Sequence, residues 1–184
     1  MYQASENKYG INPKVSLKKF WFALYTKPKH EFKAEQYLNS LDIENYLPTT
    51  TTLKKWSDRK KKITEPLLKG YIFVHCNEKE RYEALQHDAI VSTVCFEGKP
   101  ARIPGWQIDN LKKFLEEKKE VFVSDVVKVG TKVKIAEGPF SGVTGIVCQS
   151  AEHGKMLGVT IDLLRRTVLV RLPKESIVKE TTEK

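Results

Sequence analysis

The sequence predicts an α+β protein, in which an N-terminal α/β sandwich with a mostly antiparallel sheet precedes a small β-barrel. Up to residue 120, short apolar runs typical of strands alternate with amphipathic stretches typical of helices. From Val127 to Val178, no stretch has a helical pattern, and four or five short strands follow one another between turn residues. Short connections between neighbouring strands favour antiparallel pairing in the first part.

Each element of the first part follows from a local pattern. FWFALY at 20–25 is short and aromatic, as in a buried strand, and KGYIFVHC at 69–76 has the same character. Residues 29–41 place Ala34, Leu38 and other apolar side chains on one face of a helix. The remaining predicted elements are extended segments at 44–53 and 90–96, a helix at 77–88 and a helix at the end of 103–119.

The second part is interrupted by turns. GPFSGVTG at 138–145 contains three glycines and a proline between two predicted strands. Proline fixes φ and glycine tolerates positive φ, so this stretch predicts a tight turn between the strands. The other boundaries follow from composition: we expect a flexible leader at 1–17, a first domain at 18–120, a linker at 121–126 and a barrel domain at 127–184.

The charge of the chain favours acidic partners. Lys and Arg number 32 and Asp and Glu 23, giving a formal net charge of +9, which suits nucleic acid or a ribonucleoprotein. No apolar run approaches the ~20 residues of a membrane span, and the N-terminus has no hydrophobic signal core. Cys76, Cys95 and Cys148 are widely spaced, as in a reducing compartment. We therefore expect a cytoplasmic protein that does not contact a membrane.

The sequence contains no pattern typical of catalysis. None of the four histidines lies in a metal-ligand or nucleophile motif. His75 and Cys76 are neighbours in a predicted strand and so point to opposite faces. GPFSG lies between strands rather than ahead of a helix, where a phosphate-binding loop would stand. We expect no enzyme activity, no metal and no cofactor.

The stretch KKWSDRKKK at 54–62 carries six basic residues, one acid and a tryptophan. These positive charges repel one another unless an anion lies between them. A tryptophan among basic side chains is typical of nucleic-acid contact. A solvated hairpin tip is the alternative interpretation. The predicted nucleic-acid-binding residues are Lys54, Lys55, Trp56, Arg59, Lys60, Lys61 and Lys62.

The strand around GYIFVH has two apolar faces. Alternation puts Tyr71, Phe73 and His75 on one face, and Ile72 and Val74 on the other. Either helices cover both faces, or one face is left for a partner.

Two motifs carry a family resemblance. VGTKVKIAEGPFSGVTGIVCQ resembles the KOW motif, whose turn here is Gly138, Pro139, Phe140, Gly142, Gly145 and Val147. WFALYTKPKHE at 21–31 and EPLLKGYIFVHC at 65–76 resemble the N-terminal domain of NusG-type transcription elongation factors. The motifs occur in the family's order, and the resemblance covers about residues 20–180. It implies an RNA polymerase-binding N-terminal domain followed by an SH3-like KOW barrel.

A narrower resemblance concerns KKWSDRKKKITEPLLKGYIFV, which is similar to specialised NusG paralogues. Those bacterial proteins are antitermination regulators of long operons such as capsular polysaccharide clusters. The resemblance implies a monomeric transcription factor that promotes processive elongation. The alternatives are a housekeeping NusG and a KOW-containing ribosomal or translation-associated RNA-binding protein.

The family resemblance also implies binding residues. Residues matching Tyr25, Leu68, Tyr71 and Phe73 form an apolar patch that docks onto the clamp helices of RNA polymerase, and Phe96 extends it. The charged stretch then meets DNA near the transcription bubble. In specialised relatives a hydroxyl-rich motif on the second helix makes a further polymerase contact, and the corresponding Arg81, Tyr82 and Glu83 lack its threonines.

The KOW barrel of the family recruits other factors, such as a ribosomal protein or a termination factor. Its contact segment resembles IDLLRRT here. The implied partner-binding residues are Phe140, Leu163, Leu164 and Arg166. Alternatively, Leu163 and Leu164 fill the barrel interior.

Overall fold

The computed structural model describes residues 18–55, 60–116, 121–124, 131–138, 140–150, 154–172 and 176–180. It confirms a mixed α/β protein with three helices, and every strand pairing among these residues is antiparallel. The N-terminal sheet has the order β2-β5-β1-β6, with β9 also paired to β1. Its strands are β1 (Phe20–Thr26), β2 (Glu44–Tyr46), β5 (Tyr71–Cys76), β6 (Ile90–Thr93) and β9 (Arg102–Ile103).

The register of β1 and β5 defines the two faces of the N-terminal sheet. Tyr25 lies opposite Tyr71 and Ala23 lies opposite Phe73, while Ile72 falls between them on the other face. The alternation predicted from GYIFVH is therefore confirmed. We call the face of Tyr25, Tyr71 and Phe73 the docking face, and the opposite one the helix face.

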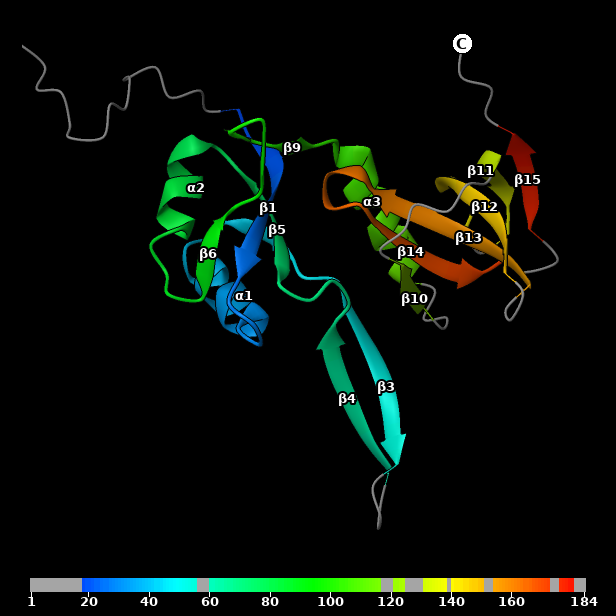
Figure 1. Cartoon of the computed structure of the whole chain (residues 1–184), viewed down its shortest axis with the longest axis horizontal. Helices are drawn as coiled ribbons and strands as arrows, with labels where there is room; N and C mark the ends of the chain where they lie inside the picture. The colour runs from blue at the N-terminus through cyan, green and yellow to red at the C-terminus, as the bar shows by residue number, and fades with distance from the viewer. Residues whose placement is uncertain are drawn as a thin grey trace, which may run out of the picture.

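Helices α1 (Glu31–Ser40) and α2 (Glu78–Ala84) cover the helix face (Figure 1). Asn77 begins α2 with a capping box, in which its side chain accepts from the Glu80 amide and the Glu80 carboxylate accepts from the Asn77 amide. The residues that share this buried cluster are Phe22, Leu24, Ala34, Leu38, Ile43, Leu47, Ile72, Val74, Cys76, Ala84, Ala89 and Ile90.

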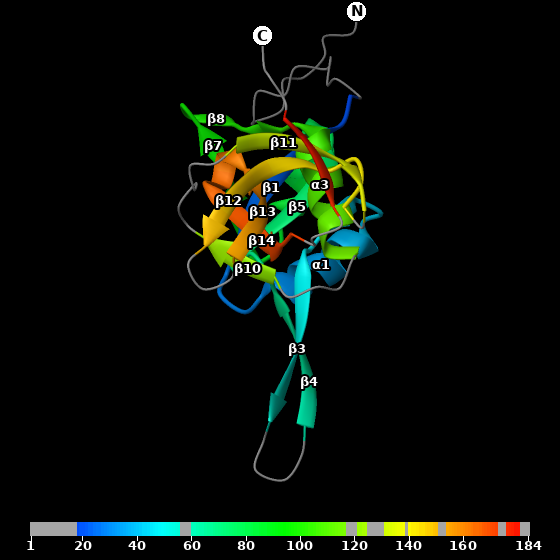
Figure 2. The same cartoon turned by 90° about the vertical axis from the view of Figure 1, so that its right-hand side faces the viewer.

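Two strands form a ribbon that leaves the body of the protein. β3 (Thr49–Lys55) pairs with β4 (Lys60–Pro66) along seven residues, and Figures 1 and 2 show the pair extending away from both sheets. The prediction of an extended segment at 44–53 agrees with β3. The charged stretch at 54–62 was interpreted as a loop, and β4 was not predicted. A lysine-rich run lacks the apolar alternation of a half-buried strand, and here the partner strand rather than burial fixes its conformation.

The C-terminal sheet contains six strands among the described residues, in the order β10-β14-β13-β12-β11-β15. Its strands are β10 (Val121–Ser124), β11 (Thr131–Glu137), β12 (Thr144–Ser150), β13 (Gly154–Ile161), β14 (Arg166–Arg171) and β15 (Ile177–Glu180), with a 3-10 turn η1 (Asp162–Leu164) after β13. β10 lies within the segment that the sequence assigned to a linker. Its pairing with β14 brings the chain into the C-terminal sheet shortly after the last helix.

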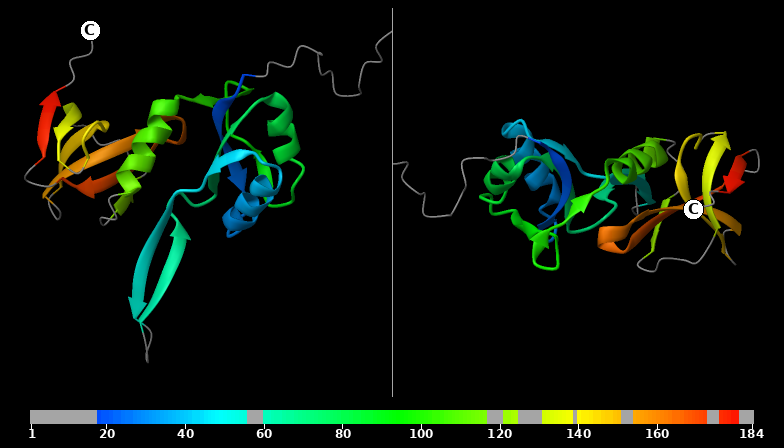
Figure 3. Two further views of the ribbon diagram at one scale, coloured as in Figure 1. Left: turned by 180° about the vertical axis from the view of Figure 1, so that it is seen from behind. Right: turned by 90° about the horizontal axis from the view of Figure 1, so that it is seen from above.

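Helix α3 (Gly105–Glu116) lies between the two sheets, as Figures 1 and 3 show. A short hairpin, β7 (Cys95–Phe96) with β8 (Lys99–Pro100), precedes it. One buried cluster runs from Phe73 of the docking face through Leu111 of α3 to Val168 of the C-terminal sheet. The helix face and the docking face are thus both covered, but by different parts of the chain. No helix in the described ranges is long and apolar enough to cross a membrane.

Candidate partner-binding face and charged ribbon

The structure brings four of the predicted polymerase-binding residues together on the docking face. The rings of Tyr25 and Tyr71 lie 4.8 Å apart, and the Tyr71 hydroxyl donates to the Tyr25 hydroxyl at 3.2 Å. Phe73 follows on the same face, and Leu68 precedes β5 and belongs to the same cluster as Phe73. Tyr25 is 40% exposed, whereas Leu68 and Phe73 are only 2% and 0% exposed. The face therefore has an open edge and a covered centre.

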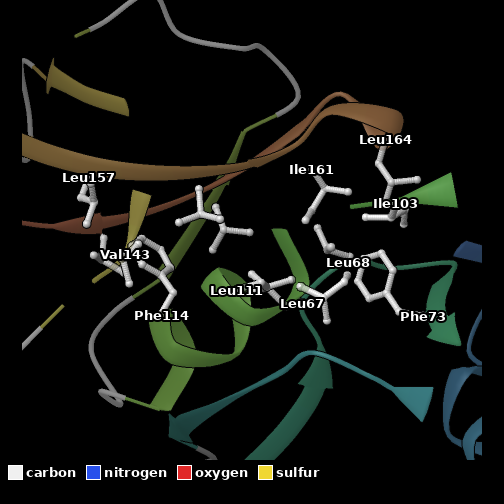
Figure 4. Packing of buried hydrophobic residues seen from close by; sticks show 14 of the residues in the cluster. Leu67, Leu68, Phe73, Ile103, Leu111, Phe114, Val143, Leu157, Ile161 and Leu164 are labelled. Carbon is white, nitrogen blue, oxygen red and sulfur yellow. The ribbon is translucent and has the colours of Figure 1, made fainter. Parts of the chain in front are cut away.

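The cover of this centre comes from α3 and from the C-terminal sheet. Figure 4 shows Leu68 and Phe73 across from Ile161 and Leu164, in the buried cluster that joins the two halves. Leu164 is one of the residues predicted to bind a second partner. The two surfaces that the sequence assigns to different partners therefore lie against each other.

Polar contacts accompany this apolar contact. The Gln107 side-chain amide donates to the Asp162 carboxylate at 2.7 Å, and that of Asn110 donates to the Thr144 carbonyl at 3.1 Å. Gln107 and Asn110 are buried in α3, and the Gln107 Oε1 atom has no hydrogen-bond partner among the described residues. These buried amides make the contact more polar than a purely apolar core, as contacts between domains commonly are.

The other predicted partner-binding residues of the C-terminal half lie in or beside the same contact. Phe140 is 1% exposed, and its ring lies 5.3 Å from that of Phe114 in α3. Leu163 is half-buried and lines a groove between the halves, together with Phe96 of β7 and Asp162. Phe96, the fifth predicted polymerase-binding residue, is 67% exposed and lies apart from the Tyr25–Tyr71 pair at this groove.

Burial changes the acid–base behaviour of the docking face. Burial and, after it, the hydrogen bond with Tyr25 together raise the pKa of Tyr71 to about 12, whereas the positive charge of Arg166 opposes the shift. Arg166 begins β14, so a side chain of the C-terminal sheet acts electrostatically on the docking face.

Sequence reasoning missed two aromatic residues of this region. Trp21 stacks on His75 with ring centroids 5.2 Å apart, and Tyr46 stacks on Phe73 at 6.4 Å. The Lys112 ammonium lies over both missed rings, 4.9 Å from that of Trp21 and 5.4 Å from that of Tyr46. Strand alternation back from Tyr25 would have placed Trp21 on the docking face. Nothing in the sequence around Tyr46 indicated its position.

Arg81, at the position where specialised relatives have a hydroxyl-rich motif, serves the fold. It is 4% exposed and donates to Thr93 Oγ1 at 3.1 Å and to the Glu78 carboxylate. Its guanidinium also lies 4.7 Å from the centre of the Tyr82 ring. Arg81 therefore anchors α2 to β6, while Tyr82 is half exposed.

The charged residues of the ribbon form opposed pairs. Lys55 lies opposite Lys60, and Lys54 lies opposite Lys61, in the register of β3 and β4. Lys55, Lys60, Lys61 and Lys62 are exposed. Trp56 and Arg59, and the side chain of Lys54, lie outside the described part of the chain. Like charges directly opposite each other destabilise a strand pair, and Lys55 opposite Lys60 is such a pair.

The described residues thus combine an apolar sheet face, covered by α3 and the C-terminal sheet, with a cationic ribbon outside it. In the described part of the chain no three His, Cys, Asp or Glu residues gather as a metal site would require. The family model described as "Transcription termination factor nusG" matches residues 19–112, 94 of the 184 residues. The chain belongs to the NusG family, whose members are non-enzymatic transcription factors of elongation and termination that bind RNA polymerase.

One solved structure similar to the chain is described as "Domain interaction in Thermotoga maritima NusG". Sequence identity is 25%, the TM-score is 0.44, and the match covers 85% of this chain and 98% of that one. No curated protein matches the chain.

Proposed function

We propose that this chain is a transcription elongation factor that binds the clamp helices of RNA polymerase through its docking face and promotes processive elongation or antitermination. A specialised long operon, such as a capsular polysaccharide cluster, is the proposed site of action, in keeping with the stretch around KKWSDRKKK. The observation that carries the proposal is that α1 and α2 cover only one face of the N-terminal sheet. The aromatic docking face packs instead against α3 and the C-terminal sheet, which is the cover that we propose separates.

Binding through this face requires movement. Leu68 and Phe73 lie under Ile161 and Leu164, so the C-terminal sheet must leave before helices of another protein can pack there. Apolar grooves with aromatic anchors are a common way to bind helices. Only molecules in the open state could then bind, so a small open fraction would lower the apparent affinity for polymerase. Any change that favours opening would raise this affinity.

The opening that uncovers the docking face would also expose residues of the C-terminal half. We propose that residues 127–184 are a KOW barrel domain and that, once released, it presents Phe140, Leu163, Leu164 and Arg166 to a ribosomal protein or a termination factor. Phe140 and Leu164 are buried in the closed arrangement. Polymerase binding and recruitment of the second partner would therefore favour each other, because both draw on the open state.

The effect on elongation follows from position rather than chemistry. A domain docked on the clamp would keep the polymerase cleft closed around its nucleic acid, and the ribbon would contact DNA near the transcription bubble. The outcome is a shift of the polymerase population towards its active state.

The test measures the dissociation constant for core RNA polymerase from the same source. Tyr25→Ala and Phe96→Ala remove exposed aromatic side chains without opening the core, and each should weaken binding about 10- to 30-fold if these residues are anchors. Asp162→Ala deletes the acceptor of the Gln107 amide and should favour the open state by about 1–2 kcal/mol. Its polymerase affinity should therefore rise by up to about 30-fold.

Trp106→Ala is the matched control, because Trp106 is 52% exposed and lies outside the proposed surface. Its affinity should equal that of wild type. If Tyr25→Ala and Phe96→Ala also bind like wild type, the polymerase does not use this face. If Asp162→Ala binds more weakly than wild type, the C-terminal half supports binding and does not compete with it.

A further inference from the structure

We propose that the groove between the β7–β8 hairpin and η1 binds an acidic, amphipathic segment of a partner protein, and that this binding holds the two halves together. The inference rests on the proposed function, because it assigns a ligand to the closed arrangement that polymerase binding has to open. The groove has a volume of about 910 Å³, which lies within the range of ligand-binding pockets in proteins.

One wall of the groove is a hairpin with a two-residue loop. Phe96 and Lys99 are opposite each other in β7 and β8 and therefore share one face. The loop residues Glu97 and Gly98 both have positive φ, 49° and 75°, as the tight turn of such a hairpin requires. Phe96 and Lys99 both line the groove. This wall thus presents an exposed aromatic ring beside a cation.

The other wall is the turn between β13 and β14 (Figure 2). Leu163 of η1 is half-buried and lines the groove. Arg165 ends η1 in the left-handed region with φ 49°, and its amide donates to the Asp162 carbonyl at 3.1 Å. Arg165 is exposed and also lines the groove. The second wall therefore repeats the combination of an apolar side chain and a cation.

The groove is continuous with the buried contact between the halves. Val94 directly precedes β7, Leu164 directly follows Leu163, and both Val94 and Leu164 belong to the cluster that joins the two sheets. The apolar surface of this cluster continues outward to Phe96 and Leu163. A segment that packs on these two side chains would extend a contact that the chain already makes with itself.

Cations on both walls are available to a partner. Lys99, Arg102 and Arg165 line the groove, and none of them has an ion-pair partner among the described residues. The Arg102 guanidinium lies instead over the Phe20 ring, 3.7 Å from its centroid. Carboxylates spaced along one bound segment would pair with a cation from each wall.

The acids of the groove do not balance these cations. Arg81 balances the charge of Glu78, which leaves two acids, Glu97 and Asp162, against three cations. The Asp162 carboxylate already accepts the Gln107 amide, and Glu97 has no hydrogen bond or ion pair among the described residues. The lining therefore has a positive excess, and a segment with more acids than bases complements it.

Other occupants match this groove less well. A second copy of the chain has a net charge of +9, and residues 1–17 contain two lysines and one glutamate, so neither supplies an excess of carboxylates. A nucleic acid carries a phosphate at every nucleotide and would bring some of them against Glu97 and Asp162. A peptide can place its carboxylates at the cations and its apolar side chains at Phe96 and Leu163.

A ligand in this groove should regulate opening. The two walls belong to different halves, so the groove exists only while the halves are in contact. A ligand that binds only the closed arrangement stabilises it by RT ln(1 + [ligand]/Kd). Under the proposed function, polymerase binds only the open arrangement. The ligand and polymerase should therefore exclude each other.

The probe is selected from a phage library of random 12-residue peptides, with the full chain as target. Peptides that also bind a Lys99→Glu/Arg165→Glu variant are removed, and the remaining ones are synthesised and measured by fluorescence anisotropy. Phe96→Ala, Lys99→Glu and Arg165→Glu test the two walls. Lys33→Glu and Lys155→Glu are matched charge controls, because these exposed lysines lie outside the groove, one in each half.

Trp106→Ala is the control for Phe96→Ala, since Trp106 is an exposed aromatic residue outside the groove. Equal melting temperatures establish that all variants are folded. The selected peptides should carry apolar residues flanked by an excess of acids. Each charge reversal should weaken their binding about 10-fold or more, and Phe96→Ala about 30-fold. The three controls should bind like wild type.

Two measurements test whether the ligand closes the protein. Saturating peptide should slow hydrogen exchange at Leu67 to Phe73, which the C-terminal sheet covers. Peptide at 100 times its Kd should lower the apparent affinity for core RNA polymerase by up to about 100-fold.

The proposal is overturned if no peptide remains after the counter-selection, if the selected peptides lack an excess of acids, or if only one wall affects their binding. It is also overturned if Lys99→Glu and Arg165→Glu weaken binding of a DNA oligonucleotide as strongly as binding of the peptide, because the groove is then a nucleic-acid site. Unchanged hydrogen exchange with bound peptide contradicts the closing role. The peptide and exchange measurements contain no polymerase, so they can fail while wild type binds polymerase, and they can succeed if it does not.

Discussion

The two faces of the N-terminal sheet have similar apolar composition but different covers. On the helix face, Phe22 and Val74 pack in one cluster with α1 and α2, which directly follow β1 and β5 in the chain. On the docking face, Phe73 packs in one cluster with Leu164, about 90 residues further along. The first cover is local and continuous with the sheet it protects. The second comes from α3 and from another sheet, and under the proposed function the first cover is permanent and the second is exchangeable.

The polar groups buried under the two covers differ in kind. The helix face contains one buried cation, Arg81, whose terminal nitrogens bond Thr93 and Glu78. The docking-face contact includes the buried amides of Gln107 and Asn110 and leaves one amide oxygen without a partner among the described residues. Arg81 Nε also lacks a hydrogen-bond partner among the described residues, so both covers contain an unsatisfied atom and they differ in the kind of group that is buried.

The largest expected effect comes from breaking the permanent cover. Phe22 is 1% exposed on the helix face, and Phe22→Ala should lower the free energy of unfolding of the N-terminal half by about 3–5 kcal/mol. Urea denaturation followed by tryptophan fluorescence measures this change, since Trp21 is adjacent. Phe32→Ala, at a 38% exposed position of α1, should change stability by no more than about 0.5 kcal/mol. A loss below about 1 kcal/mol at Phe22 would contradict the permanent burial of this face.

An intermediate effect comes from damaging the exchangeable cover itself. A Cβ atom at Gly145 would lie 2.4 Å from the Gly158 carbonyl oxygen across β12 and β13, so Gly145→Ala forces the backbones apart. We expect a cost of about 1–3 kcal/mol, confined to the C-terminal sheet. Hydrogen exchange should then accelerate in that sheet and at Leu67 to Phe73, but not in α1.

Gly105→Ala is the control for that variant, because its Cβ atom would meet only Trp21 at 3.9 Å, an ordinary contact. Hydrogen exchange in this variant should match wild type. If Gly145→Ala accelerates exchange equally in α1 and in the C-terminal sheet, the two halves unfold as one unit and the docking face is not exchangeable.

Local periodicity predicted the elements of both halves but not how the halves meet. The helices, the main C-terminal strands and the two-faced pattern around Phe73 all follow from spacings of two or three to four residues. β4 was missed because its lysines carry no apolar alternation. The contact of Phe73 with the C-terminal sheet left no local trace, since Leu164 suits a barrel interior, a partner surface and a contact with α3 equally well. Whether a particular apolar residue binds a partner or its own chain depends on which distant surfaces fit together.

The smallest expected effect is a pH dependence that distinguishes the faces. The pKa of Tyr71 on the docking face rises from 10.0 to about 12, mainly through burial, and burial also raises the pKa of Cys76 on the helix face from 9.0 to about 12. The folded protein therefore keeps protons that the unfolded chain releases first. The stabilisation is fully present below the unfolded-state values and is lost as pH rises towards 12.

Tyr71→Phe removes the group that titrates on the docking face and should reduce the loss of stability between pH 10 and 12. Cys76→Ser should instead reduce the loss that begins near pH 9, because the unfolded thiol gives up its proton earlier. Denaturant unfolding at pH 9, 10, 11 and 12 measures both slopes, and Tyr82→Phe at a 50% exposed position serves as the control. Since Tyr71 is partly exposed at the open edge, its share should be the smaller one, and a Tyr71→Phe slope identical to wild type would mean that solvent already reaches the hydroxyl in the closed state.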